Sequence, residues 1–586
     1  MKILNIILFF NLIAYPVFSQ DYGNCDKPLP TEKIFLHTDR DRYITGEKIW
    51  FKAYCLENDS LQSEFSKVLY IELFDANKNV YLQNKYKLSK GTAAGNLLIP
   101  ENINSGNYFL RAYTLYQRNF PVENLYTQVV SIINPENKSQ EIENIQQPDK
   151  TKFEKVNNTK SYKFLPIKTT KSKYHQREKI KLKIDNFDEI ADMSISVRIK
   201  GSGYDNETIK LYYAQNNWLQ YFFENSKIYS SSYNFNKKNI LKNVNDLKWI
   251  PEIRYLTLSG IVRKKETEEP VPNLTCISSV ISKKPQIHLT NTGKDGRFVF
   301  SFNNLRGEHK LFVGIKDNSD DETEILVNNN FSSDFPEIQN IPLIYNDSLN
   351  KIFETIFLNY QITKKFKPIN NKNAFSIYNH SFSGFNLGNP DIIIDLKTYI
   401  ELPSLDDIIR ELIPGVNVYG PRGERGISIF SKREKRTYKD PLILLDNIPI
   451  FNIEKLLQIE PSLIKTIEVY NSKYILGNHY LNGIFSIKTK TNNFASYKWD
   501  DNSVFVSVKT LDKPQIFTYP DYSESISSPI PDFRTTLYWN PIINSENIND
   551  IQFFSSDVCN TYEVIIKGFS KTGKSFFGKT EFEVVR

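Results

Sequence analysis

The sequence contains few of the residues on which enzyme active sites are commonly built. Its 586 residues include only six histidines, four cysteines and two methionines. The patterns H-E-x-x-H, C-x-x-C and G-x-S-x-G, which mark zinc peptidases, thiol redox sites and α/β-hydrolases, do not occur. We therefore assign no catalytic, cofactor-binding or metal-ligating residue, and we expect a protein that is not an enzyme.

Long apolar runs are also scarce, and the only one extends from Ile3 to Val17. Lys2 precedes this run, and Val17 and Ser19 occupy the −3 and −1 positions of a small-residue cleavage site, as in a secretory signal peptide. The run is shorter than the ~20 residues that a membrane span needs, although an N-terminal anchor is the alternative. Residues 1–19 are therefore predicted to direct export.

The chain has no segment dominated by basic residues. Its net charge of +7 arises from 74 Lys and Arg against 67 Asp and Glu, scattered along the whole length. A nucleic-acid partner would require basic residues gathered on one face, so none is expected. The four cysteines are Cys25, Cys55, Cys276 and Cys559. Export permits a disulfide between the first two, whereas the last two lie in distant segments and are as readily explained as buried free thiols.

Aromatic residues are plentiful, at 13% of the chain, and alternating apolar positions indicate strands over most of the sequence. Ile34 and Leu36 alternate before a Thr-Gly turn, and Ile49, Phe51 and Ala53 alternate after it. Residues 20–135 are therefore predicted to form a β-sandwich. The stretches "LHTDRDRYITGEKIWFKAY" and "SGNYFLRAYT" resemble the second macroglobulin domain of the α2-macroglobulin family, in the form found in outer-membrane-associated bacterial proteins.

His37, Asp39 and Arg40 belong to that motif. We interpret His37 as a strand-end residue that is hydrogen-bonded to its own turn. The thioester sequence Cys-Gly-Glu-Gln of complement-type relatives is absent, since Cys559 is followed by Asn-Thr-Tyr. Covalent trapping of proteases is therefore not expected.

Further β units follow along the chain. Residues 136–165 are polar and are predicted to be a linker, and residues 166–245 and 493–586 each resemble a macroglobulin-like unit. Residues 246–330 resemble a carboxypeptidase regulatory-like sandwich, an accessory domain without a zinc site, with an Asp295-Gly296 turn before the strand "FVF". Within 331–390, Asp347–Phe366 is an amphipathic helix. A connector packed on the next domain is the favoured interpretation of this helix, and a membrane-surface helix is the alternative.

Residues 391–492 combine strands with helices that begin near Leu405 and Ile453. "PLILLDNIPI", "IKTIEV" and "LNGIFSIKTK" occur in the order typical of the plug domain of TonB-dependent outer-membrane receptors, which this segment resembles. Asn447 replaces the usual turn glycine but also tolerates φ > 0. The loop before the last strand departs from the family pattern and is "YILGNHYL". Only 586 − 492 = 94 residues follow, too few for a 22-stranded barrel of about 10 residues per strand, so no transmembrane barrel is expected.

Three short motifs have alternative explanations. "GFSKTGKS", Gly568–Ser575, fits the phosphate-binding P-loop pattern, but a strand-like sequence follows where a helix is required, so we predict a hairpin turn and no nucleotide. "KREKR", Lys432–Arg436, is predicted to be a solvated hairpin loop, with an anionic ligand or lipid headgroup site as the alternative. "DNSDDETE", Asp317–Glu324, is predicted to be an acidic surface loop, with calcium binding as the alternative.

The sequence thus predicts a mostly β protein of tandem β-sandwich domains with one α+β plug-like domain. Its expected role is that of an exported, non-enzymatic binding or scaffold protein associated with the outer membrane. The expected partner is a protein of that membrane, for which a TonB-dependent barrel is one candidate. The alternatives are an accessory component of a TonB-dependent transport system and, less favoured, a protease-interacting macroglobulin-like protein.

Overall fold

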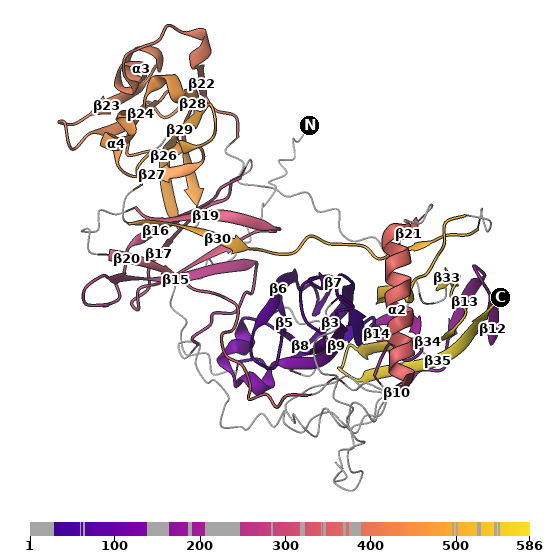
Figure 1. Ribbon diagram of the computed structural model, residues 1–586. Coiled ribbons are helices and arrows are strands. Elements are labelled where there is room, and N and C mark those ends of the chain that lie inside the picture. The colour runs from indigo at the N-terminus through magenta and orange to yellow at the C-terminus, as the bar shows by residue number, and fades with distance from the viewer. Residues whose placement is uncertain are drawn as a thin grey trace, which may run out of the picture.

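Figure 1 shows the computed structural model of the chain. The structure describes residues 29–58, 60–61, 65–136, 163–185, 190–204, 247–282, 285–316, 323–341, 343, 347–366, 371–373, 388–476, 478–494, 497–499, 502–523, 529–543, 548 and 551–586. The predicted signal peptide, most of the linker and the first six residues of the acidic loop 317–324 lie outside these residues. The described part is mostly β, as predicted.

The N-terminal domain, the first sandwich, consists of two facing sheets. Its alternating residues Ile34, Leu36, Ile49, Phe51 and Ala53 are all buried in one core, which confirms the predicted inward face. One sheet contains β1 (Glu32–Thr38), β3 (Lys48–Glu57), β4 (Ser60–Leu61) and β7 (Thr92–Leu98). The other contains β2 (Arg42–Ile44), β9 (Tyr126–Ile133), β8 (Gly106–Tyr113), β5 (Val68–Phe74) and β6 (Val80–Lys87).

A second domain, the outer sandwich, is assembled from two distant parts of the chain. Strand β14 (Ile190–Ile199) pairs with both β32 (Thr536–Ile543) and β34 (Thr561–Ser570). The segments predicted as separate macroglobulin-like units therefore form one sandwich rather than two. Its remaining strands are β10 (Lys163–Phe164), β11 (Ile167–Thr169), β12 (Lys173–His175), β13 (Lys179–Ile184), β33 (Gln552–Phe554) and β35 (Ser575–Val585).

A third domain, the inner sandwich, lies in the chain between the two halves of the outer one. One sheet has the order β18-β15-β20, with β15 (Leu256–Lys264), β18 (Arg297–Phe302) and β20 (Thr323–Val327). The other has the order β17-β16-β19-β30, with β16 (Thr275–Val280), β17 (Ile287–Asn291), β19 (Glu308–Ile315) and β30 (Ser503–Lys509). Gly296 has φ +70° in the turn before β18, at the predicted Asp-Gly turn. The sequence places residues 503–509 in the C-terminal unit, but as β30 they pair with β19 along the whole strand.

The α+β domain, residues 388–499, is inserted between β20 and β30 of the inner sandwich. Its main sheet has the order β22-β28-β29-β26-β27: β22 (Ile392–Asp395), β26 (Leu442–Leu445), β27 (Ile448–Ile450), β28 (Ile464–Leu476) and β29 (His479–Thr489). A smaller sheet contains β23 (Val416–Tyr419), β24 (Gly426–Ser431) and β25 (Arg436–Lys439). Helices α3 (Leu405–Leu412) and α4 (Ile453–Leu457) begin where the sequence predicts, and β26 runs parallel to β29, so the predicted small mixed sheet with two helices is confirmed.

Local sequence explains these elements. The Ser404 hydroxyl accepts from the backbone N–H of Asp407 at 3.2 Å and caps α3, and Asn452 caps α4 in the same way through the N–H of Lys455. Asp446 and Asn447 have φ of +47° and +70°, as a tight hairpin turn between β26 and β27 requires. The predicted tolerance of Asn447 for positive φ is therefore confirmed.

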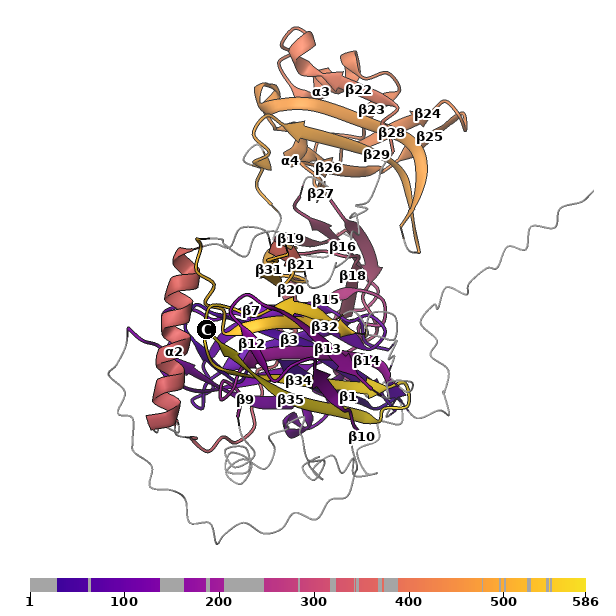
Figure 2. The same ribbon diagram turned by 90° about the vertical axis from the view of Figure 1, so that its right-hand side faces the viewer.

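The α+β domain is inserted in the sequence of the inner sandwich, which is itself inserted in the sequence of the outer sandwich. The domains follow the same order in space. In both views the α+β domain lies at one end, the inner sandwich lies beside it, and the first and outer sandwiches pack together at the other end (Figure 1 and Figure 2). Strand β21 (Asn371–Asn373), which lies between α2 and the α+β domain in the chain, pairs with β31 (Thr518–Pro520), which follows β30 and leads back to the outer sandwich. The α+β domain is thus the most distant unit from the first sandwich.

Helix α2 (Asp347–Lys365) confirms the predicted helix, but the helix packs on other domains than the predicted one. Phe353 and Ile356 are buried. Figure 2 shows the helix standing along the first and outer sandwiches, and the hydroxyl of Thr363 donates to the carbonyl of Phe533 at 3.4 Å. The helix therefore connects the two earlier domains and does not pack on the α+β domain that follows it.

Candidate binding surfaces

The P-loop-like segment Gly568–Ser575 is a β-hairpin. It connects β34 and β35, which pair antiparallel up to Phe569 and Ser575. The backbone N–H of Ser570 donates to the carbonyl of Lys574 at 2.9 Å, and Gly573 has φ +75° in the turn. A strand therefore follows where a phosphate site requires a helix N-terminus, so the predicted hairpin turn is confirmed.

His37 lies at the buried interface between the first and outer sandwiches, and we call such an interface between two domains a joint. Its Nδ1 lies 2.7 Å from the Ser194 hydroxyl, which is also 2.7 Å from the hydroxyl of Tyr54. The ring packs edge-on against Trp539, with centroids 5.1 Å apart. Burial, together with the positive charges of Lys567 and Arg198, lowers the pKa of His37 well below its usual value. The predicted hydrogen bond of His37 to its own turn was therefore wrong, because its partner lies on a distant strand.

Asp39 and Arg40 strengthen the same joint. The Asp39 carboxylate accepts from the Thr536 hydroxyl of the outer sandwich at 2.8 Å and from the backbone N–H of Trp50 at 3.0 Å. Arg40 pairs with Asp39 at 3.2 Å and with Glu47 at 3.1 Å. Because these groups are buried and satisfy one another, their role is to hold two domains in register rather than to bind a ligand.

The outer sandwich contributes its own charges to the joint. Arg198 donates from Nε to Glu563 at 2.7 Å and from Nη1 to the carbonyl of Asp39 at 3.3 Å. Desolvation raises the pKa of Glu563, but the charges of Arg198 and Lys579 outweigh it and lower that pKa below its usual value. Glu563 is therefore held as a carboxylate inside the joint.

A second joint connects the first sandwich to the inner sandwich through Glu252. Its carboxyl group accepts from the Tyr70 hydroxyl at 3.0 Å and from the backbone N–H of Thr257 at 2.7 Å. Burial raises the pKa of Glu252 to about 7, although hydrogen bonds and the charge of Lys85 oppose the rise. Burial likewise lowers the pKa of Lys85 to about 8. This joint contains groups that titrate near neutral pH.

The α+β domain docks on the inner sandwich through an apolar interface. One face of its main sheet and one face of the β17-β16-β19-β30 sheet form a single buried cluster: Ile277, Ile287 and Phe312 from the sandwich, and Leu442, Leu444, Ile448, Tyr470, Leu481 and Ile484 from the α+β domain. The hydroxyl of Ser279 donates to the carbonyl of Asn447 across this interface at 2.7 Å. The α+β domain is thus fixed by one sheet face, and its other surfaces remain available.

The parts of the domain that this interface leaves uncovered expose large apolar side chains. Ile393, on the edge strand β22, is 60% exposed, and Ile400, a few residues further on, is 88% exposed. Ile475 and Tyr480, which we call the tip pair, are 68% and 73% exposed near the end of the β28–β29 hairpin. No motif in the sequence predicts a functional role for these four residues. The departure from the plug pattern at "YILGNHYL" was the signal that could have indicated the tip pair.

Exposed basic residues lie beside this hairpin. Lys432–Arg436, which we call the basic turn, joins β24 and β25, and all five of its residues are exposed, as predicted. Its Glu434 lies 3.6 Å from the ammonium of Lys473 on β28. The basic turn and the β28–β29 hairpin are therefore neighbours in space.

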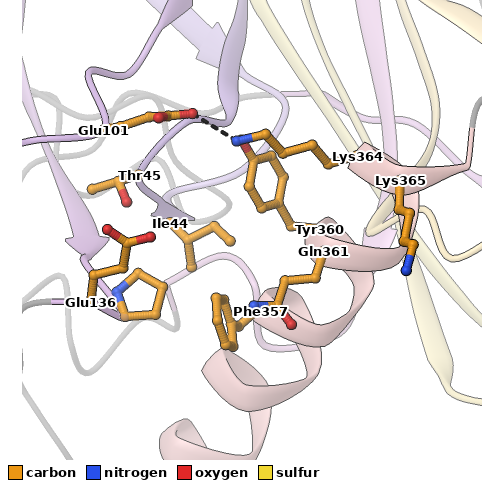
Figure 3. A pocket seen from close by; sticks show the side chains of 10 residues that line it. Ile44, Thr45, Glu101, Glu136, Phe357, Tyr360, Gln361, Lys364 and Lys365 are labelled. Atoms are coloured by element: carbon orange, nitrogen blue, oxygen red, sulfur yellow. Dashed lines mark hydrogen bonds and ion pairs between the residues drawn. The ribbon is translucent and has the colours of Figure 1, made fainter.

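A cavity of about 300 Å³ lies between α2 and the first sandwich. Figure 3 shows Tyr360, Gln361 and Phe357 of the helix facing Ile44 and Thr45. Glu101 and Lys364 form an ion pair of 2.8 Å at its rim. Both partners of this pair are solvated and neutralise each other, and the lining contains one further charge of each sign, on Glu136 and Lys365.

The described part of the chain contains no group of His, Cys, Asp and Glu side chains that could hold a metal ion. Within those residues no helix is long and apolar enough to cross a membrane. Cys55 and Cys276 are buried, and Cys559 is exposed. Cys25 lies outside the described residues.

Comparisons with known proteins give only distant likenesses. No protein-family model and no curated protein matches the chain. A mutant α2-macroglobulin from Salmonella is 8% identical, with a TM-score of 0.22, over 98% of this chain and 41% of that one. Trypsin-activated α2-macroglobulin from Escherichia coli is 8% identical, with a TM-score of 0.21, over 96% and 42%.

A CARDB domain from Pyrococcus furiosus, solved with di-metal ions, is 15% identical, with a TM-score of 0.14, over 18% of this chain and 96% of that one. This chain thus spans less than half the length of the two macroglobulins. These TM-scores are too low to assign the fold of any of the three proteins to this chain.

Proposed function

We propose that this chain is an exported, non-enzymatic binding or scaffold protein of the outer membrane, which presents its α+β domain to a protein partner. The observation that supports the proposal is the buried apolar interface between that domain and the inner sandwich. An apolar sheet face packed on the inner sandwich fixes the orientation of the domain, while Ile393, at the edge of that sheet, and Ile400 stay exposed. A fixed domain with exposed apolar residues is suited to binding another protein.

The resemblance of this domain to receptor plugs favours one kind of partner. The second candidate function is that of an accessory to a TonB-dependent transport system, in which the partner is a separate barrel. The interface with the inner sandwich bears on how such a partner would bind. One face of the main sheet is already covered, so a barrel would contact the edge strand β22 and the surface around Ile400 rather than enclose the whole domain.

Affinity capture from detergent-solubilised outer membranes tests both candidates. The bait is the full chain, compared with the variant Ile393→Asp with Ile400→Asp and with the control Val80→Asp with Leu98→Asp on the first sandwich, where exposed apolar residues are also replaced. We expect the wild type and the control, but not the first variant, to recover one outer-membrane protein in stoichiometric amount. A barrel among the captured proteins would favour the transport accessory. Equal recovery by all three baits, or no specific recovery, would contradict the proposal.

A further inference from the structure

The outer part of the β28–β29 hairpin has two different faces. Beyond an irregularity after Tyr470 the two strands pair regularly, with Tyr474 opposite Leu481 and Ile475 opposite Tyr480. Side chains alternate between faces along a strand, so Tyr474 and Leu481 share one face and the tip pair shares the other. The first face packs into the apolar interface with the inner sandwich. The tip pair therefore points away from the inner sandwich, which agrees with its exposure.

The exposed face of the hairpin leads directly to the basic turn. Lys473 lies on the same face as the tip pair, two residues before Ile475, a rise of about 7 Å. Its ammonium lies 3.6 Å from Glu434 of the basic turn and 5.5 Å from the centre of the Tyr438 ring. The basic turn itself contains four cationic side chains and one carboxylate. An aliphatic and an aromatic side chain thus protrude next to a net positive surface.

We propose that the tip pair and the basic turn form a docking surface for a lipid bilayer that contains anionic phospholipid. Tyrosine is well suited to the headgroup region because its ring is apolar and its hydroxyl is polar. Ile475 enters the acyl boundary beside it, and the cationic side chains of the basic turn contact headgroup phosphates. Charge complementarity favours this occupant over an apolar protein groove, which would leave the basic residues at the contact without partners.

This surface also gives a role to the basic turn, for which the sequence left a solvated loop and a headgroup site as alternatives. The lipid contact deepens the proposed membrane association, on which it rests. The α+β domain is fixed on the inner sandwich, and Figure 2 shows the hairpin extending beyond the body of that domain. The same domain can therefore contact a bilayer through the hairpin and a protein through the β22 edge.

Co-sedimentation of the full chain with protein-free vesicles tests the proposal. The vesicles contain phosphatidylcholine alone or a mixture with phosphatidylglycerol. Two variants remove the two parts of the surface separately: Ile475→Ser with Tyr480→Ser, and Gln in place of the four cations Lys432, Arg433, Lys435 and Arg436. We expect the wild type to bind the mixed vesicles, and each variant to bind about tenfold more weakly or worse, because each removes one of two cooperating contributions.

Matched controls distinguish binding through this surface from the general attraction of a basic protein to anionic vesicles. Leu98→Ser with Leu326→Ser removes two exposed apolar residues elsewhere. Gln at Lys168, Lys179, Lys181 and Lys183 removes the same four charges from the exposed face of β11 and β13. Both controls should bind within about twofold of the wild type. Equal losses in the basic-turn variant and the lysine control, or unchanged binding of the tip-pair variant, would overturn the proposal, as would failure of the wild type to bind the mixed vesicles.

Insertion of the tip pair has a direct readout. Tyr480→Trp should gain a fluorescence component that brominated lipid quenches, whereas Leu98→Trp should not. Release of the wild type by inorganic phosphate at constant ionic strength would indicate a simple anion site and overturn the bilayer assignment. Because the vesicles hold no protein, these outcomes are independent of the capture experiment. Loss of lipid binding with intact capture would overturn only the lipid contact, and the reverse result only the proposed protein partner.

Discussion

Removal of the Phe312 side chain should loosen the α+β domain from the inner sandwich. Phe312 is fully buried in the shared apolar cluster, and its ring centre lies 5.3 Å from that of Trp499 and 5.5 Å from that of Phe505. Truncation of a buried phenylalanine to alanine costs about 3–5 kcal/mol, since it removes apolar contacts and leaves a cavity. Phe312→Ala should therefore lower the free energy of unfolding by about that amount, while Phe430→Ala, at an exposed position, should change it by no more than about 0.5 kcal/mol.

The assay needs to report on the two domains separately, because a chain of several domains does not unfold in one step. Hydrogen–deuterium exchange measured by mass spectrometry in increasing urea meets this need. Strands β26 and β29 form the face that Phe312 covers, so their amides should exchange at lower urea in Phe312→Ala and not in Phe430→Ala. Equal protection of these strands in the two variants would refute the reasoning that the interface fixes the α+β domain.

Three further predictions concern the joints and the hairpin turn. Because the folded state raises the pKa of Glu252 from 4.5 to about 7, it retains a proton that the unfolded chain releases. Stability should therefore fall as pH rises from about 4.5 to 7, and Glu252→Gln should remove this dependence and raise stability at pH 8 by up to about 3 kcal/mol, measured at pH 5 and 8 from the urea transition that unfolds β5 and β15. Arg198→Ala should cost about 1–3 kcal/mol in the urea transition of the outer sandwich, because it removes a hydrogen-bond partner of the buried Glu563 and leaves Lys579 to pair with that carboxylate. Lys200→Ala, which breaks a solvated pair, should cost at most about 1 kcal/mol. Gly573→Val should cost about 1–3 kcal/mol in thermal unfolding because of its positive φ, and Lys574→Ala at most about 0.5 kcal/mol. Saturable ATP binding that Lys574→Ala abolishes would contradict the hairpin assignment.

Local sequence patterns were sufficient to predict individual elements of this fold. Alternating residues such as Ile34 and Phe51 identify inward faces, and Ser404 and Asn452 precede helices at capping positions. Turn residues also indicate conformation, as Asn447 and Gly573 do through their positive φ. Each of these signals acts within a few residues and can therefore be read along the chain.

The arrangement of the domains could not be predicted in the same way. Ser196 pairs with Ile565, and Phe312 pairs with Phe505, across long inserted segments. The alternating pattern of a strand does not indicate with which distant strand it pairs. For this reason the sequence assigns the halves of the outer sandwich to separate units and β30 to the wrong domain. The partner of His37 was missed for the same reason, because Ser194 lies in another domain.

The surfaces that we propose to be functional could be predicted only in part from the sequence. The sequence identified the basic turn as a candidate, but not its neighbours. The exposure of Ile475 and Tyr480 depends on which face of β28 packs against the inner sandwich. Their alternation along the strands is visible in the sequence, but the direction in which they point requires the structure.

The central claim is that this chain is an exported component of the outer membrane, and fractionation of the cell envelope tests it most directly. Mature protein should sediment with the outer-membrane fraction, and its N-terminal sequence should begin at Gln20, after the predicted cleavage site. Recovery of the chain in the cytoplasmic fraction with Met1 intact would contradict the claim.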